Sequence, residues 1–190
     1  MSKRSIGVIG AGPMGWQIAR RLCALGYHVQ AYDQDPASAE RLTDFGVCVV
    51  RVPAELAESA DAVILTVAHE RAAENAIFDS GGVTETLPFG HPVVDLSGVG
   101  ANYGVGAARR LEAMGLRWVE ATLLGRPRLA EPWSLCLAAG ETEDLRSAGQ
   151  LLLGLAQHVA MLPCLGAVSR MRPLTSDLAD AVIFEPRASA

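Results

Sequence analysis

Three glycines close to the N-terminus have the spacing of a phosphate-binding loop. Gly10, Gly12 and Gly15 follow an apolar run, residues 6–9, that is too short for anything but a strand. A helical pattern begins at once after them, because apolar residues recur at spacings of four, four and three, namely Met14, Ile18, Leu22 and Leu25. Strand, glycine turn and helix form the context in which a Gly-x-Gly-x-x-Gly motif binds a dinucleotide.

Each glycine of such a loop has its own task. Gly10 would permit the tight turn, Gly12 would let the backbone approach a pyrophosphate, and Gly15 would let the helix pack close to the strand. The start of the helix also offers unpaired N–H groups and the positive end of its dipole to a phosphate. The alternative is a glycine-rich turn that only connects two elements, and the matched context argues against it.

An acidic residue follows at the distance where a dinucleotide site places one. Asp33 stands at the C-terminal end of a second predicted strand, residues 27–32, and about 20 residues beyond the glycines. A carboxylate there can accept both ribose hydroxyls of NAD, whereas the 2′-phosphate of NADP would meet a like charge and bind roughly a hundredfold more weakly. The next residue is Gln34 rather than an arginine. The alternative role for Asp33 is a helix cap, but Asp35 followed by Pro36 makes the better cap, so NAD is favoured.

The composition indicates one globular domain that binds no nucleic acid. Half of the 190 residues are hydrophobic, and 21 acidic residues outnumber 16 basic ones. Neither a signal peptide nor a membrane span is expected, which predicts a cytoplasmic protein. The cysteines show no paired spacing and are expected to be small core residues in a reducing compartment, namely Cys23, Cys48, Cys136 and Cys164. No metal site is inferred, because the histidines lack metal-ligand spacing with any cysteine or carboxylate.

Strands and helices alternate along the whole chain. Strands are predicted at residues 47–50, 62–67, 92–96, 117–121, 135–139 and 158–162, after the two already named. Helices are predicted at about residues 37–45, 53–57, 70–77, 101–114 and 143–156. This alternation is typical of an α/β fold of the Rossmann type, with a doubly wound, mainly parallel sheet.

The glycine run resembles that of the beta-hydroxyacid dehydrogenase family, which includes 3-hydroxyisobutyrate and 6-phosphogluconate dehydrogenases and related imine reductases. Its residues are similar to that family's Gly-x-Gly-x-Met-Gly, and they are Gly10, Ala11, Gly12, Pro13, Met14 and Gly15. The resemblance extends over about residues 5–172. It implies that this loop binds the pyrophosphate, that Asp33 binds the ribose, and that Val67 and Ala68 lie along the cofactor.

The resemblance also implies where the substrate binds, although this sequence differs from the family's motifs at several positions there. The stretch 95–98 is similar to the family's Asp-x-Ser-Thr motif, which implies that Ser97 and Gly98 contact the substrate. Leu124 replaces a substrate-binding serine, and Arg172 stands where the family has its catalytic lysine. Arginine keeps its proton near neutral pH, so Arg172 could stabilise a developing alkoxide but would be a poor proton donor. From the residues alone, Ser97 could equally be a turn serine, and Arg172 a solvated surface residue.

Two functions follow from this reading. The first is an NAD(P)-dependent oxidoreductase that transfers hydride on a small hydroxy acid, carbonyl or imine substrate; the alternative is a non-catalytic dinucleotide-binding module or subunit. Residues 1–165 are expected to form the dinucleotide-binding domain, and residues 166–190 a short C-terminal helical tail in place of the family's helical domain. Apolar residues at helical spacing in this tail predict packing on another chain, most simply in a homodimer, and they are Leu174, Leu178, Ala181 and Val182. The alternative is that this face folds back onto the sheet. A closed substrate site would need such self-association or a separate helical partner chain.

Overall fold

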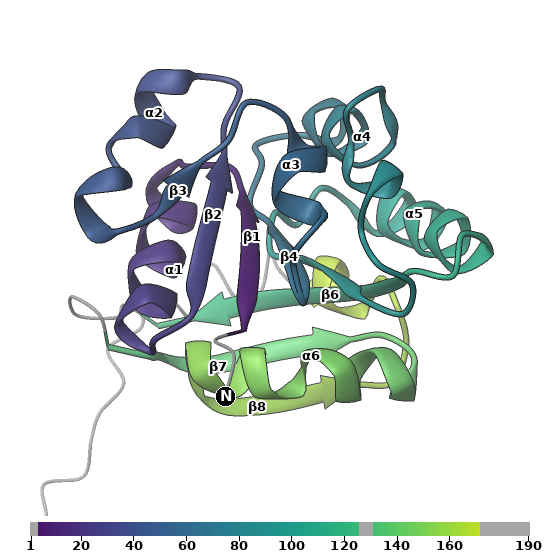
Figure 1. The fold of residues 1–190 in the computed structure, drawn as a ribbon. Helices are drawn as coiled ribbons and strands as arrows, with labels where there is room; N and C mark the ends of the chain where they lie inside the picture. Colours follow the sequence, from purple (N-terminus) through teal and green to yellow (C-terminus); the bar gives the residue numbers. More distant parts are fainter. Residues whose placement is uncertain (1–3, 126–130, 172–190) are drawn as a thin grey trace, which may run out of the picture.

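A single eight-stranded sheet runs through the protein (Figure 1). The computed structural model describes residues 4–125 and 131–171. The strands are β1 (Ser5–Ile9), β2 (His28–Tyr32), β3 (Cys48–Val49), β4 (Ala62–Leu65), β5 (Pro92–Asp95), β6 (Arg117–Leu124), β7 (Trp133–Ala139) and β8 (Ala156–Leu162). The helices are α1 (Pro13–Ala24), α2 (Pro36–Glu40), α3 (Pro53–Ala57), α4 (Glu70–Phe78), α5 (Ala101–Ala113) and α6 (Thr142–Leu155). A further helical turn covers residues 167–171.

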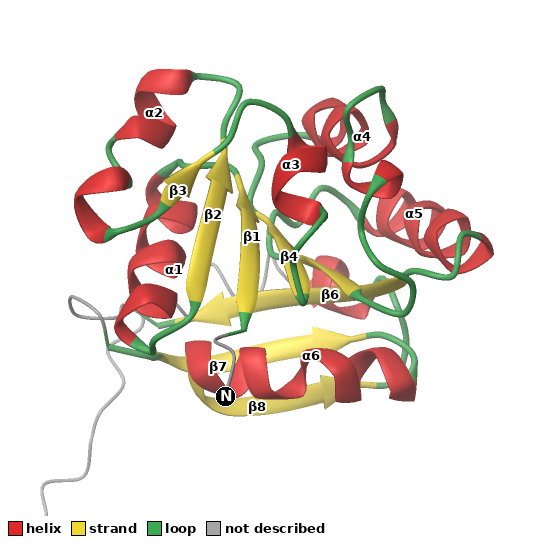
Figure 2. Ribbon diagram, in the orientation of Figure 1, coloured by secondary structure: helices red, strands yellow, loops and turns green. Residues whose placement is uncertain are grey.

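The strand order is β3-β2-β1-β4-β5-β6-β7-β8, so β1 lies inside the sheet with β2 and β4 on either side. The strands from β3 to β6 are parallel, which confirms the predicted doubly wound Rossmann-type architecture. In Figure 2, β7 and β8 run across the direction of β1 and β2, because strand twist accumulates over a wide sheet.

One pairing differs from the expected parallel pattern. Strand β7 runs antiparallel to β6, with Leu124 opposite Leu135, and β8 returns to run parallel to β7. The chain between the end of β6 and the start of β7 at Trp133 is too short for the crossover that a parallel pair requires. The two strands therefore form a hairpin at the edge of the nucleotide-binding half.

Two apolar cores lie on opposite faces of the sheet. Because side chains alternate along a strand, Val94 enters the core beneath α1 and α6, and its neighbour Val93 enters the core beneath α3, α4 and α5. All four residues of β4 are buried, as expected for a strand covered on both faces. Each fully buried leucine or isoleucine contributes about 1.5–3 kcal/mol to folding.

The apolar residues predicted on one face of α1 differ in burial. On α1, Ile18 and Leu22 are buried, but Met14 and Leu25 are 38% and 41% exposed, because they lie at the two ends of the helix. Trp16 lies off this face, is half-buried, and meets the Phe45 ring edge-on at 5.4 Å between centroids.

The cysteines also differ from the expected pattern. Only Cys136 is buried, Cys23 is half-buried, and Cys48 and Cys164 are exposed. Both exposed thiols lie at or beyond strand ends near the sheet's edges, where less structure covers them.

Some predictions fall outside the described residues. These are the role of Arg172 and the helical face formed by residues 174–182. Within the parts of the chain that are described, no helix has the length and apolar character needed to cross a membrane. The same parts contain no cluster of three or more His, Cys, Asp or Glu side chains suited to a metal ion.

Candidate functional site

The turn between β1 and α1 can be made only with glycine at its first position. Gly10 has a φ of 98°, and a Cβ added to it would lie 2.6 Å from the Thr66 carbonyl oxygen. Its amide donates to the Tyr32 carbonyl at 2.8 Å, which joins the turn to the end of β2. The left-handed backbone and the close approach of β4 both exclude a side chain at this position.

The other two glycines differ sharply in their surroundings. A Cβ on Gly15 would lie 1.8 Å from the Gly10 carbonyl oxygen, so this glycine lets the first turn of α1 pack on its own loop. A Cβ on Gly12 would meet nothing within 4 Å, and its φ of −63° suits any residue. The fold therefore does not require glycine at position 12, whereas a ligand approaching the backbone there would.

The first turn of α1 is free to receive an anion. Gly12 is the N-cap of this helix, and no side chain caps it. Pro13 follows at the first helical position, where its missing N–H is not needed. An uncapped helix start beside open space at Gly12 is the setting that a phosphate site requires, since it offers backbone N–H groups and the positive end of the helix dipole.

Asp33 is fixed against the glycine loop. Its Oδ2 accepts a hydrogen bond from the Ala11 amide at 2.6 Å, and its Oδ1 accepts one from the Asp35 amide at 2.8 Å. The cap of α2 is Asp35, which accepts from the Ala37 amide and from the Ser38 hydroxyl. The Ser38 hydrogen bond is the largest cause of the lowered pKa of Asp35. Asp33 is therefore not the helix cap.

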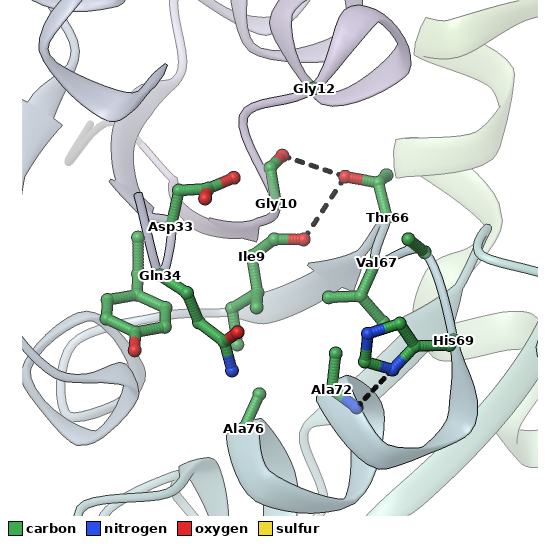
Figure 3. Close-up of a pocket in the computed structure, with 12 residues that line it drawn as sticks. Ile9, Gly10, Gly12, Asp33, Gln34, Thr66, Val67, His69, Ala72 and Ala76 are labelled. Carbon is green, nitrogen blue, oxygen red and sulfur yellow. Dashed lines mark hydrogen bonds between the residues drawn. The ribbon is translucent and has the colours of Figure 1, made fainter. Parts of the chain in front are cut away.

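Thr66 is a site residue that sequence reasoning missed. Its hydroxyl lies 2.8 Å from the Gly10 carbonyl oxygen and 3.1 Å from that of Ile9, and donates to this pair from the end of β4 (Figure 3). The signal available was a hydroxyl residue in an otherwise apolar strand pattern at residues 62–67. The contact holds the loop from the side opposite to Asp33.

These groups border a pocket of about 210 Å³ (Figure 3). Five of the predicted cofactor residues line it, namely Gly10, Gly12, Asp33, Val67 and Ala68. The other lining residues are Ile9, Tyr32, Gln34, Thr66, His69, Ala72 and Ala76. The pocket lies at the carboxyl ends of β1, β2 and β4, where open α/β sheets bind ligands.

Comparison with known proteins agrees with this geometry. Residues 5–166 match the family described as the NAD binding domain of 6-phosphogluconate dehydrogenase. The chain belongs to that family. The resemblance seen in the glycine motif is thereby confirmed.

Individual relatives of this NAD binding domain are longer than the chain. Human mitochondrial 3-hydroxyisobutyrate dehydrogenase is 31% identical over 153 residues, which cover 80% of this chain and 46% of the relative. L-threonate dehydrogenase of Cupriavidus necator is 30% identical over 178 residues, covering 93% and 60% of the two chains. An imine reductase of Myxococcus stipitatus in complex with NADP+ shares the fold at a TM-score of 0.80 and 16% identity, covering 92% of this chain and 60% of that one. The chain thus spans about half of the length of the proteins it matches.

The predicted substrate residues of the NAD binding domain lie beside this pocket and do not line it. The Ser97 hydroxyl accepts from the Val67 amide at 2.8 Å, and the Ser97 amide donates to Asp95 at 2.8 Å. Gly98 follows with a φ of 63°. Ser97 therefore connects the segments that follow β4 and β5, at a position next to the pocket-lining residue Val67.

A buried carboxylate organises the far side of the site. Glu120 is 2% exposed, and its carboxylate accepts from the amides of Gly166 and Ser169, each at 2.7 Å, and from the Ser169 hydroxyl. It lies in register with Asp95 on the neighbouring strand. The sequence signal for this role is an acidic residue within the otherwise apolar strand pattern at residues 117–121. This contact fixes the start of the 167–171 helical turn, which precedes Arg172 in the sequence.

Proposed function

We propose that this NAD binding domain serves an oxidoreductase that transfers hydride between NAD and a small hydroxy acid, carbonyl or imine substrate. The observation that carries the proposal is the hydrogen bond from the Ala11 amide to Asp33 Oδ2 at 2.6 Å. It places a carboxylate at the edge of a glycine loop whose outer side is open, as a site for ribose and diphosphate together requires.

The residues present fit the cofactor. The open side of Gly12 and the uncapped start of α1 would hold the diphosphate, and Asp33 would accept the ribose hydroxyls. Val67 and Ala68 would lie along the cofactor toward β5. When bound, the nicotinamide group supplies or takes up the hydride, while the protein binds and orients the reactants.

The choice of NAD over NADP rests on Asp33 and Gln34. A 2′-phosphate near the Asp33 carboxylate would meet a like charge, and Gln34 offers no cationic side chain in compensation. NADPH is expected to bind roughly a hundredfold more weakly than NADH. The imine reductase that holds NADP+ shares only the fold with this chain, so its cofactor does not decide the question.

Substrate would bind beyond β5, beside Ser97 and Gly98, with Arg172 as the candidate group for the developing charge. Arginine holds an anion well but does not readily release its proton. Protonation of a reduced ketone would then come from water, whereas an iminium arrives already protonated. A homodimer, or a separate helical chain, would complete the substrate side.

The decisive experiment is a fluorescence titration of the full chain with NADH and NADPH, followed by a turnover assay. Tight NADH binding with a clear preference over NADPH supports the cofactor assignment, and equal affinities contradict it. Oxidation of NADH in the presence of keto acids or cyclic imines supports catalysis.

A non-catalytic dinucleotide-binding module is the second candidate. The observation in its favour is that the Ser97 hydroxyl already accepts from the Val67 amide, which gives it a structural role. NADH binding without turnover of any of the tested keto acids or cyclic imines would favour this second function over the first.

A further inference from the structure

His69 has a defined structural role at the start of α4. It is the N-cap of that helix, with an extended backbone, and its ring accepts a hydrogen bond from the Ala72 amide at 3.1 Å through Nδ1. Histidine is not among the usual capping residues, which are serine, threonine, aspartate and asparagine. Its presence here has a chemical consequence that those residues would not have.

The cap fixes the tautomer of the ring. Because Nδ1 accepts a hydrogen bond, it carries a lone pair, so the proton of the neutral imidazole resides on Nε2. Figure 3 shows this second nitrogen on the side of the ring away from the Ala72 amide, facing the space enclosed by the pocket residues. The pocket is therefore provided with an N–H donor held in one orientation.

We propose that His69 binds the cofactor by donating this Nε2 hydrogen to an oxygen of the diphosphate. The inference rests on the proposed dinucleotide function of the pocket. Asp33 and Gln34 form one wall, and His69 forms the wall across from them, on the β4 side (Figure 3). The ribose is assigned to Asp33, which accepts hydrogen bonds, and a diphosphate oxygen is the most strongly accepting group that a dinucleotide offers to a donor on the opposite wall, because it carries negative charge.

Charge also favours this assignment. A hydrogen bond to an anionic oxygen is roughly twice as strong as one between neutral groups. The contact would add to the amides at the start of α1 in neutralising the diphosphate. Loss of one such donor is expected to weaken binding about tenfold.

Three variants separate the donor from the cap. His69→Asn keeps a good N-cap and removes the donor at Nε2, so it should bind NADH and ADP-ribose about tenfold more weakly with an unchanged Tm. His69→Ala removes both functions, so its affinity and its Tm should both fall. His69→Asp keeps the cap and adds a negative charge, so it should lose more affinity than the asparagine variant. Adenosine, which lacks the diphosphate, should bind all four proteins equally.

The experiment is NADH titration by fluorescence and competition by ADP-ribose and adenosine, each on the full chain. NADH binding by His69→Asn at the unmodified affinity would overturn the proposal, as would an equal loss of adenosine binding. An aspartate variant no worse than the asparagine variant would contradict an anionic acceptor. Failure of the unmodified chain to bind NADH would instead refute the dinucleotide function, and the inference with it, before any variant is compared.

Discussion

The Asp33 carboxylate at the end of β2 accepts the Ala11 amide at 2.6 Å, which joins the second strand to the turn after the first. A second backbone amide, from Asp35, holds the other carboxylate oxygen. The protein therefore already orients the carboxylate that would accept the ribose hydroxyls. Each of the two Asp33 carboxylate oxygens retains a lone pair for a ligand hydroxyl.

Asp33→Ala should remove most of the preference for NADH over NADPH. The repulsion of the 2′-phosphate disappears with the carboxylate, and NADH loses its ribose acceptor. Parallel fluorescence titrations with both cofactors measure the effect. Asp33→Asn is the matched control, because it keeps the shape and removes the charge. A variant that retains the full preference would show that another residue sets it.

Gly12→Val should abolish NADH binding and leave the protein folded, whereas Gly15→Val should unfold it. The added side chain at position 12 enters open space on the ligand side, but the one at position 15 would lie 1.8 Å from the Gly10 carbonyl oxygen. Circular dichroism with thermal melting reports the fold, and fluorescence titration reports binding. A Gly12→Val protein that unfolds would mean that this glycine serves packing.

Glu120→Ala should lower the free energy of unfolding by about 3 kcal/mol, because it leaves the amides of Gly166 and Ser169 without their acceptor. Ser169→Ala is the control, since it removes only the hydroxyl donor and should cost about 1 kcal/mol. Urea denaturation of both variants tests whether Glu120→Ala lowers the free energy of unfolding more than Ser169→Ala does. Equal stability of the two would contradict the capping role of Glu120.

The thiols should react in an order set by burial. Cys48 and Cys164 are exposed, whereas burial raises the pKa of Cys136 to about 12 and leaves almost no thiolate near neutral pH. Mass spectrometry after brief alkylation of the native protein should find the first two modified and Cys136 intact. In denaturant, where the pKa returns to its ordinary value, all should react. Rapid native labelling of Cys136 would show that its strand opens readily.

Imines should be better substrates than ketones, and Arg172→Lys should raise ketone reduction more than imine reduction. Lysine can donate a proton to the reduced carbonyl, whereas arginine holds its own and an iminium needs none. The assay follows NADH absorbance with a panel of keto acids and cyclic imines on both proteins. Faster ketone than imine reduction by the unmodified chain would refute the proton-donor argument.

The cofactor side of the site could be predicted from sequence because its signals are local. The glycines and the two strand patterns each depend on neighbours in the chain, and Asp33 stands at a fixed distance after them. The predicted strands and helices agree with the structure to within a few residues at most boundaries. Turns, strands and helices depend on local backbone conformation and on alternating burial, and both are visible as residue types and spacings in the sequence.

The remainder depends on contacts between distant parts of the chain. Glu120 accepts hydrogen bonds at the start of the 167–171 helical turn, from the amides of Gly166 and Ser169, and no periodic pattern in the sequence predicts such a distant pairing. The partner of the Ser97 hydroxyl is the amide of Val67, in the segment that follows β4 and 30 residues earlier in the chain. Strand β7 runs antiparallel to β6 because the connection between them is short. The alternation of strands and helices along the sequence predicted a parallel pair there.

The position of β1 between β2 and β4 has a consequence for biosynthesis. Every described residue that lines the pocket falls between Ile9 and Ala76, and the strands that carry them are mutual neighbours in the sheet. Chains emerge from the ribosome N-terminus first, at about 5–20 residues per second, so these strands are available before β6, β7 and β8 exist. The later strands extend a sheet whose nucleotide pocket is already encoded in full by the nascent chain.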